Sequence, residues 1–517
     1  MPENPGMSRR KLIGLGAATV AATALPDALF RLSSAAAATG PTEGIGYFAR
    51  FGVTEKMLRD GLSAALSRGA DYADLFFQHR VGNSLALEDG EVNRASASVE
   101  LGVGVRAVKG DQTGYAYTED LTPEALVQAA RTAAAIADGP ARPGPKGLKA
   151  DASLPSRYPV KTRWEDVRPQ QKLPLLSGLN ERVFAADKRI TKVNVFFGDE
   201  AGAILIADSN GRVVEDLQPM TRLGLSCVAE QDGKKETNGY NDAGRADIGY
   251  YSPDRLERIV KEAVSRTVVL FEAVQPPAGE MPVVLGAGAS GILLHEAIGH
   301  GMEADFNRKG ISIFADRIGK PVANTVVSIV DEGTIAGARG AINVDDEGNP
   351  VEKTMLVENG ILTTYLHDSI SAKHYKVKPT GNGRRESYAY APVPRMRATY
   401  MLPGPHKKDE IVASVKKGIY CTNFTNGQVQ IGAGDFTFYV KNGYLIEDGK
   451  LTTPIKDVNI IGNGPKVLEK IDMVADDLVI DEGGWTCGKD GQSVPVSQGI
   501  PTVRVASITV GGRGKQA

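Results

Sequence analysis

A histidine, a glutamate and a second histidine lie within six residues in the segment Leu293-Leu294-His295-Glu296-Ala297-Ile298-Gly299-His300. Imidazole nitrogen is a preferred ligand of zinc, and a glutamate beside such a ligand can hold and deprotonate a water molecule. The chain contains only 6 histidines, so this pattern rarely arises by chance. The segment predicts a zinc site of a hydrolase, with His295 and His300 as ligands and Glu296 as the general base.

The spacing of the two histidines makes a demand on the backbone. The common motif H-E-x-x-H places its ligands four residues apart on one helical face, whereas here they are five apart. Five residues of a regular α-helix turn roughly 140° past a full turn, so the two rings would diverge. A π-type turn would leave them roughly 50° apart, and Gly299 makes that departure cheap. We therefore expect an i→i+5 hydrogen bond here, or a helix that ends before His300.

The motif does not specify a third ligand. The candidates are the other histidines, nearby acids and the cysteines: His79, His367, His374, His406, Glu303, Asp305, Cys227, Cys421 and Cys487. Glu303 and Asp305 could instead hold the ring N–H groups of the ligands. Cys487 lies in a glycine-rich loop, and Lys489 close by favours a thiolate. The other two cysteines have apolar or strand-like surroundings, which are typical of small core residues.

A second motif competes for the same region. The segment Gly286-Ala287-Gly288-Ala289-Ser290-Gly291 is a literal G-x-G-x-x-G between a strand-like and a helical stretch, as in dinucleotide-binding proteins. That fingerprint also requires a second strand ending in an acid about 20 residues later. The interval contains the His-Glu motif instead, so we interpret these glycines as a sharp turn from a strand into a buried helix.

Composition sets broad limits on the function. The chain has 517 residues with 42% hydrophobic and 24% charged residues, which is ordinary for a globular protein. A net charge of -2 without long basic runs argues against a nucleic-acid partner. No uninterrupted apolar run reaches the ~18–20 residues that a membrane-spanning helix needs, so we expect no stable membrane insertion.

The N-terminal segment has the features of an export signal. Arg9 and Arg10 precede a small-residue apolar stretch, Gly14 to Leu25, and an alanine-rich end follows. A charged start, an apolar middle and such an end are typical of a twin-arginine signal peptide. The sequence thus predicts a signal over residues 1–39 and an exported protein, periplasmic or extracellular. With three cysteines in total, at least one thiol would lie outside any intramolecular disulfide, and a metal is one stable fate for it.

The remaining chain alternates between helical and strand-like patterns. We predict an N-terminal α+β domain over residues 40–275 and a mostly β C-terminal domain over 276–517 that carries one short metal-binding helix. The linker between them is the Pro- and Gly-rich stretch 275–279. Helices are expected from the capping residues Thr54, Thr122 and Ser252, and another near 170–187. The expected N-terminal strands include 72–79, 84–88, 96–108, 191–197, 203–207, 212–216 and 222–230.

The segment from His295 through Glu303 to Asp305 resembles the signature of the TldD/PmbA family of metallopeptidases, in its active TldD-like branch. Further similarity covers nearly everything after the predicted signal. It includes Tyr72–His79 and Gly102–Ala107 towards the N-terminus, and Tyr400–Gly404 and Cys487–Gln492 towards the C-terminus.

The resemblance implies zinc held by His295, His300 and Cys487, with Glu296 as the catalytic glutamate. It also implies cleavage of small or unfolded peptides and a dimer, either of two identical chains or with a paralogue. The predicted export signal is the chief departure, because well-known relatives are cytoplasmic. His374, Tyr375 and Arg385 are candidates for stabilising the oxyanion, although no spacing argument selects among them. The rival interpretation from another class is a non-catalytic binding partner stabilised by zinc, which would fill all four metal positions with protein ligands.

Overall fold

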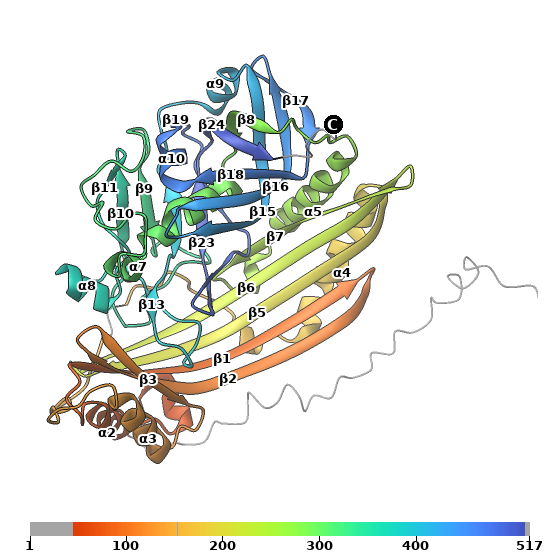
Figure 1. Ribbon diagram of the computed structural model, residues 1–517. Coiled ribbons are helices and arrows are strands. Elements are labelled where there is room, and N and C mark those ends of the chain that lie inside the picture. Colours follow the sequence, from red (N-terminus) through yellow and green to blue (C-terminus); the bar gives the residue numbers. More distant parts are fainter. Residues whose placement is uncertain (1–44, 152–153, 512–517) are drawn as a thin grey trace, which may run out of the picture. The chain divides into compact units, whose positions relative to one another are not determined.

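The protein is described by a computed structural model over residues 45–151 and 154–511 (Figure 1). The predicted signal, residues 1–39, lies outside these residues. Helices and strands both occur along the described chain, and the α+β class predicted from the sequence is confirmed. None of the described helices is long and apolar enough to cross a membrane.

The N-terminal half is built on a seven-stranded sheet in the order β3-β2-β1-β5-β6, with β4 and β7 both paired to β6. Its strands are β1 (Tyr72–Glu88), β2 (Glu91–Lys109), β3 (Gln112–Thr118), β4 (Lys149–Ala150), β5 (Ile190–Asp208), β6 (Arg212–Gln231) and β7 (Lys234–Gly244). Only the short β4 runs parallel to its neighbour. Figure 1 shows β1, β2, β5 and β6 side by side as a long, curved sheet.

Several strands are longer than the sequence predicted. The expected strands 72–79 and 84–88 are both parts of β1, and 191–197 and 203–207 are both parts of β5. The residues from Arg80 to Ser84 are half-buried on both faces of the sheet, so the alternation that marks a strand fades there without the strand ending. The hairpin turn between β1 and β2 is Asp89-Gly90, and both residues have positive φ, as such tight turns require.

Four helices cover the ends of this sheet: α2 (Glu55–Ala65), α3 (Pro123–Ala134), α4 (Pro169–Ala186) and α5 (Pro253–Val268). The side chains of Thr54, Thr122 and Ser252 accept hydrogen bonds from backbone N–H groups in the first turns of α2, α3 and α5, so the predicted caps are confirmed. Apolar side chains of α2 and α3 form one core with the sheet, and those of α4 and α5 form another. Short 3₁₀ turns complete this half: η2 (Gly46–Phe51), η3 (Trp164–Asp166), η4 (Ile248–Tyr250) and η5 (Val269–Phe271).

The C-terminal half contains two larger sheets, and the prediction that it is mostly β is confirmed. The first closes on itself, because β15 pairs with both β8 and β16 in the cycle β15-β8-β24-β18-β16. Its strands are β8 (Gly279–Leu285), β15 (Lys417–Gln430), β16 (Asp435–Glu447), β17 (Lys450–Ile455), β18 (Val458–Asn463), β19 (Ile471–Val474) and β24 (Val503–Gly511).

The second sheet has the order β11-β10-β9-β14-β23-β20. Its strands are β9 (Ile329–Glu332), β10 (Lys353–Glu358), β11 (Ile361–Leu362), β14 (Ala398–Met401), β20 (Val479–Asp481) and β23 (Ser497–Ile500). Two small hairpins are also present, made of β12 (Gly383–Arg384) with β13 (Val393–Pro394) and of β21 (Thr486–Lys489) with β22 (Gln492–Pro495).

One helical stretch follows β8 and enters the C-terminal core. It consists of four short, consecutive turns: η6 (Ala289–Gly291), α6 (Ile292–Leu294), η7 (His295–Gly299) and η8 (His300–Met302). The other C-terminal helices are α7 (Ala304–Arg308), α8 (Ser369–Tyr375), α9 (Lys408–Ala413) and α10 (Gly464–Glu469). The predicted short helix from Ser290 to about His300 therefore exists, although its backbone is not uniformly α.

Direct contacts join the two halves of the described chain. Arg106 of β2 forms buried ion pairs with Asp74 of β1 (2.5 Å) and with Glu347 of the C-terminal half (2.6 Å). Arg212 of β6 donates to the carbonyl oxygen of Gly348 at 2.7 Å. The division at residues 275 and 276 stays a prediction.

Candidate metal centre

The backbone that carries the two histidines is a π turn. Residues His295–Gly299 form η7, and the N–H of His300 donates to the carbonyl oxygen of His295. The expected i→i+5 hydrogen bond is thereby confirmed. The two imidazole rings lie 4.9 Å apart between centroids, at 84° to each other. The extra residue in the turn brings both rings to the same side of the helical stretch, as the five-residue spacing requires.

The structure brings His295, His300 and Cys487 together. One potential ligand atom from each lies within 4.8 Å of the other two, and Sγ of Cys487 is 3.4 Å from Nε2 of His300. Cys487 reaches this position from the β21–β22 hairpin, whose tight turn is Asp490-Gly491. The side chains are 4%, 7% and 2% exposed, respectively. A cation at this point would therefore be held in the protein interior.

Glu303 orients the second histidine. One of its carboxylate oxygens lies 3.1 Å from Nδ1 of His300, which leaves Nε2 facing Cys487. Lys489 contacts Glu303 at 3.2 Å and Asp305 at 2.7 Å. Arg395 lies 3.8 Å from Glu303 and donates to the carbonyl oxygen of Cys487 at 2.5 Å. Such contacts fix the tautomer and direction of a ligating ring. Asp305, which the sequence offered as a second partner for a ligand ring, contacts Lys489 instead.

The charges of the group favour a thiolate. Burial by itself would raise the pKa of Cys487, but the nearby His295 and His300 rings outweigh it and hold that pKa well below its ordinary value. Burial would likewise raise the pKa of Glu303, yet Lys489 and His300 lower it to about 2. A thiolate and two imidazoles are a ligand set that zinc favours. Nδ1 of His295 is buried and makes no hydrogen bond within the described chain. The residues therefore fit a zinc ion.

Glu296 lies beside the ligand group and next to the strand β15. Its side chain is 8% exposed, and its Cγ would be 3.0 Å from a Cβ placed on Gly427. A side chain at position 427 would therefore crowd the glutamate. The part of β15 from Phe424 to Gln430 pairs with β16 only, since β15 pairs with β8 at Ile419–Cys421 alone. Its other edge is free of strand pairing within the described chain, close to Glu296.

Glycines allow the π turn to fit against its neighbours. A Cβ on Gly299 would lie 2.1 Å from Sδ of Met396, and one on Gly464 would lie 2.1 Å from the carbonyl oxygen of Ala297. Both distances are too short for a side chain. The glycines of the stretch 286–291 likewise allow close packing against neighbouring chain. A Cβ on Gly291 would lie 2.7 Å from the backbone nitrogen of Gly499. This close packing supports the interpretation of a sharp turn into a buried helix, and not that of a nucleotide-binding loop.

The other candidates from the sequence lie elsewhere in the described chain. His79 contacts Tyr47 in the N-terminal half (2.8 Å), and His406 contacts the carbonyl oxygen of Val474 (3.1 Å). The ring of His367 meets that of Tyr375 edge to face, with 5.3 Å between centroids. Arg385 is engaged with Asp346 and Asp74. Cys227 and Cys421 are fully buried, as expected of core residues. The sequence did not point to Arg395, because a Pro-Arg-Met-Arg segment carries no motif.

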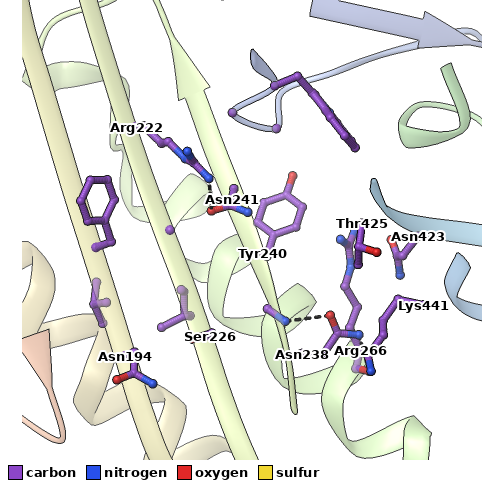
Figure 2. A pocket seen from close by; sticks show the side chains of 18 of the residues that line it. Asn194, Arg222, Ser226, Asn238, Tyr240, Asn241, Arg266, Asn423, Thr425 and Lys441 are labelled. Atoms are coloured by element: carbon purple, nitrogen blue, oxygen red, sulfur yellow. Dashed lines mark hydrogen bonds between the residues drawn. The ribbon is translucent and has the colours of Figure 1, made fainter. Parts of the chain in front are cut away.

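A cavity of about 780 Å³ is lined by Thr486, the residue before Cys487, and by Asn423, Phe424 and Thr425 of β15 (Figure 2). The side chains of His295, Glu296, His300 and Cys487 are not among its lining residues. Its walls come mainly from β1, β5, β6, β7 and β15, with Arg266 of α5, Lys441 of β16 and the segment 483–486, which ends immediately before Cys487. Figure 2 shows Arg222 and Asn241 on the side of the strands β6 and β7, with Asn423, Thr425 and Lys441 across from them. This size is typical of cavities that bind small molecules or short peptides.

Two histidines and a cysteine next to a buried glutamate define a candidate centre of a metal-dependent hydrolase. Three family descriptions match the chain. They are PmbA/TldA metallopeptidase domain 1 over residues 73–137, the central domain over 162–271 and the C-terminal domain over 278–512. A metalloprotease TldD homolog of Haemophilus influenzae is 42% identical over 454 residues, which are 86% of this chain and 94% of that protein.

More distant similarity extends to archaea. A zinc metalloprotease TldD homolog of Saccharolobus solfataricus is 25% identical over 448 residues, 86% of this chain and 97% of that protein. The crystal structure of TldE from Thermococcus kodakarensis has a TM-score of 0.66 at 19% identity and covers 89% of this chain and 99% of its own. At that identity the likeness concerns the fold. The chain belongs to the PmbA/TldD family of metallopeptidases, as its resemblance implied, and it is a peptidase.

The comparisons correct one prediction from the sequence. We expected export through a twin-arginine signal, but the relatives are TldD-family metalloproteases, archaeal members included, and their similarity gives no support for export. An arginine pair followed by a short apolar stretch is a weak, compositional pattern, and here it led to the wrong conclusion.

Proposed function

We propose that this protein is a zinc peptidase in which His295, His300 and Cys487 hold the metal and Glu296 is the general base. The observation that carries the proposal is that potential ligand atoms of His295, His300 and Cys487 lie within 4.8 Å of one another, beside the π turn that bears Glu296. When bound, zinc would polarise the scissile carbonyl and lower the pKa of a water molecule toward ~7.

The chain's own residues supply the remaining steps. The carboxylate of Glu296 accepts a proton from the attacking water and later delivers it to the nitrogen of the leaving amine. Glu303, held by Lys489, keeps Nε2 of His300 directed at the metal position. Burial of the ligand group excludes bulk water, and a drier site strengthens each of these electrostatic interactions.

The proposed substrates are small or unfolded peptides. An extended peptide can add as a strand to the free edge of β15 at residues 424–430, beside Glu296. Main-chain hydrogen bonds would then supply affinity. A dimer, of identical chains or with a paralogue such as a TldE-like protein, belongs to the same proposal, and the fold shared with TldE supports it.

The rival is a non-catalytic protein that zinc stabilises. A structural site uses four protein ligands, and the group found in the described chain has three. Peptide-cleavage profiling of metal-loaded protein beside Glu296→Gln tests the proposal. We expect a loss of at least 100-fold in kcat/KM with zinc content unchanged. Equal activity of the two proteins would remove Glu296 as the base, and absence of cleavage by the parent protein would favour the rival.

A further inference from the structure

Arg222 lines the cavity as a cation without an acidic partner among the described residues. Its Nη2 donates weakly to Asn241 at 3.3 Å, and its Nε is buried without a hydrogen bond. The two other cations of the wall are paired, Arg266 with Glu262 at 2.9 Å and Lys441 with Asp457 at 3.5 Å. A half-buried guanidinium without a counter-charge is unfavourable, so Arg222 is suited to an anion that enters with a ligand.

A second arginine, Arg339, contacts the segment 483–486 that lines the cavity. Arg339 donates to the carbonyl oxygen of Trp485 at 2.9 Å and to the hydroxyl of Thr486 at 3.4 Å. Arg222 lies against Gly484, where an added Cβ would be 2.5 Å from its Nε. Both guanidinium groups therefore contact the loop 483–486, directly before Cys487.

The surroundings of these two arginines carry an excess of positive charge. Burial, together with the charges of Arg222 and Arg245, lowers the pKa of Arg339 to about 10. Glu200 is the acid that opposes this effect, and its carboxylate already lies 3.8 Å from Arg80. Asp481 also lines the cavity, but it accepts hydrogen bonds from the indole of Trp485 and the N–H of Gly483. The local field therefore favours an anion near Arg222.

We propose that the cavity recognises a carboxylate of the bound peptide through Arg222, with Arg339 supporting the loop and the positive field. The carboxylate belongs either to an acidic side chain or to the peptide's C-terminus, since both present the same two oxygens to a guanidinium. The inference rests on the proposed peptidase function. It adds a specificity determinant to a site whose main-chain contacts would otherwise select little.

The position of Arg222 gives the carboxylate a role in placing the scissile bond. Thr486 lines the cavity, and the next residue is the proposed ligand Cys487. Asn238, Asn241 and Asn423 line the cavity as well, and their amides can donate to or accept from a peptide backbone. A carboxylate fixed at Arg222 would therefore set which peptide bond reaches Glu296.

The test compares matched peptides on the metal-loaded full chain. One pair differs by Asp or Glu against Asn or Gln, and another differs by a free against an amidated C-terminus. We expect one pair to show a preference for the carboxylate of roughly tenfold or more in kcat/KM. The pair that shows it identifies the source of the carboxylate. Arg222→Gln should bring that ratio close to one, whereas Arg222→Lys should keep part of it.

The controls separate recognition from damage. Arg131→Gln removes an exposed arginine on α3, outside the cavity wall, and should keep the ratio of the parent. General damage to the loop before Cys487 would lower both rates of a pair equally and leave their ratio unchanged. A ratio near one for both pairs in the parent, or an unchanged ratio in Arg222→Gln, overturns the inference.

Binding to Glu296→Gln provides a second readout that needs no catalysis. Fluorescence anisotropy of the same labelled peptides should show the carboxylate preference, and the preference should disappear in Glu296→Gln/Arg222→Gln. If the parent protein cleaves nothing, the proposed function fails, while the binding ratios still decide the role of Arg222. If binding shows no preference, the inference fails even where cleavage is efficient.

Discussion

The backbone N–H of His300 donates to the carbonyl oxygen of His295, five residues earlier. This single hydrogen bond reconciles a spacing that is wrong for an α-helix with two rings whose centroids lie 4.9 Å apart. A π turn has poorer hydrogen bonding than an α turn, and its surroundings must hold it in place. Here a Cβ at position 464 would meet the backbone oxygen of Ala297, and a Cβ at position 299 would force the buried side chain of Met396 to move.

Deleting Ala297 would restore the common four-residue spacing, and we expect it to abolish activity instead of creating a conventional site. The deletion shifts every residue after it by one position, including His300 and Glu303, which pairs with Lys489. It also removes the carbonyl group that packs against Gly464. Zinc content and peptide cleavage of the purified variant check this expectation. A zinc-loaded, active deletion variant would show that the π turn is dispensable.

Gly299→Ala should destabilise the fold by about 1–3 kcal/mol, because it forces a side chain into a packed interior. The new Cβ would lie 2.1 Å from Sδ of the fully buried Met396. The matched control is the same change in a Met396→Ala background, where that atom is absent. Thermal or denaturant unfolding of the four proteins should give a smaller cost for Gly299→Ala in that background. If Gly299→Ala lowered the free energy of unfolding equally in both backgrounds, its effect would not come from the contact with Met396.

Among the three cysteines, only substitution of Cys487 should lower the zinc content. Purified protein should contain about one zinc per chain, and Cys487→Ser should lose most of it, because a neutral hydroxyl is a poor substitute for a thiolate. Cys227→Ser and Cys421→Ser are matched controls. Cys227 contacts Thr267 at 3.2 Å, and burial raises the pKa of Cys421 far above its ordinary value. Elemental analysis of the three variants decides, and a Cys487→Ser protein with full zinc would mean that another residue is the third ligand.

The sequence predicted the part of the site that is contiguous in the chain. His295, Glu296 and His300 lie within six residues, so their types and spacing predict both a hydrolytic zinc site and the π turn. Cys487 is 187 residues from His300, and its approach depends on the packing of the β21–β22 hairpin. Periodicity cannot encode such a contact. The loop around Cys487 made it one candidate among several, and only the family resemblance selected it. The approach of Arg395 to Glu303 and of Arg222 to Gly484 is tertiary for the same reason.

The fold class could be predicted because helix caps and strand alternation are local. Thr54, Thr122 and Ser252 each bond to the first turn of their own helix. Strand length could not be predicted, because the alternation of apolar and polar residues appears only where one face of a sheet is buried and the other is exposed. Between Arg80 and Ser84 both faces of β1 are half-buried, and the pattern disappears while the hydrogen-bonded ladder continues.

Stability should fall as the solution is acidified from pH 6.5 to pH 4, in part through His367. Burial lowers the pKa of this ring to about 4, and the side chain is 1% exposed. Between these pH values the ring is protonated in the unfolded state but not in the folded state, so acid favours unfolding. For this group the free energy of unfolding falls by up to about 3 kcal/mol. The contribution of His367 should level off below pH 4, where its ring is protonated in both states. Unfolding midpoints across this range should be flatter for His367→Gln, whereas a parallel curve would assign the acid sensitivity to other groups.

The enzyme should cleave short unstructured peptides and leave stably folded proteins intact. His295, Glu296, His300 and Cys487 are all buried, so a substrate must bring its backbone to them in extended form. A folded loop cannot do this without unfolding, which costs more free energy than a few main-chain hydrogen bonds return. The measurement is cleavage of one polypeptide in two states, a stably folded domain and its permanently unfolded variant. We expect efficient cleavage of the unfolded chain, with negligible cleavage of the folded one over the same period. Rapid digestion of the folded domain, at a rate above its own unfolding rate, would mean that the metal group is reachable in a way that its burial does not allow.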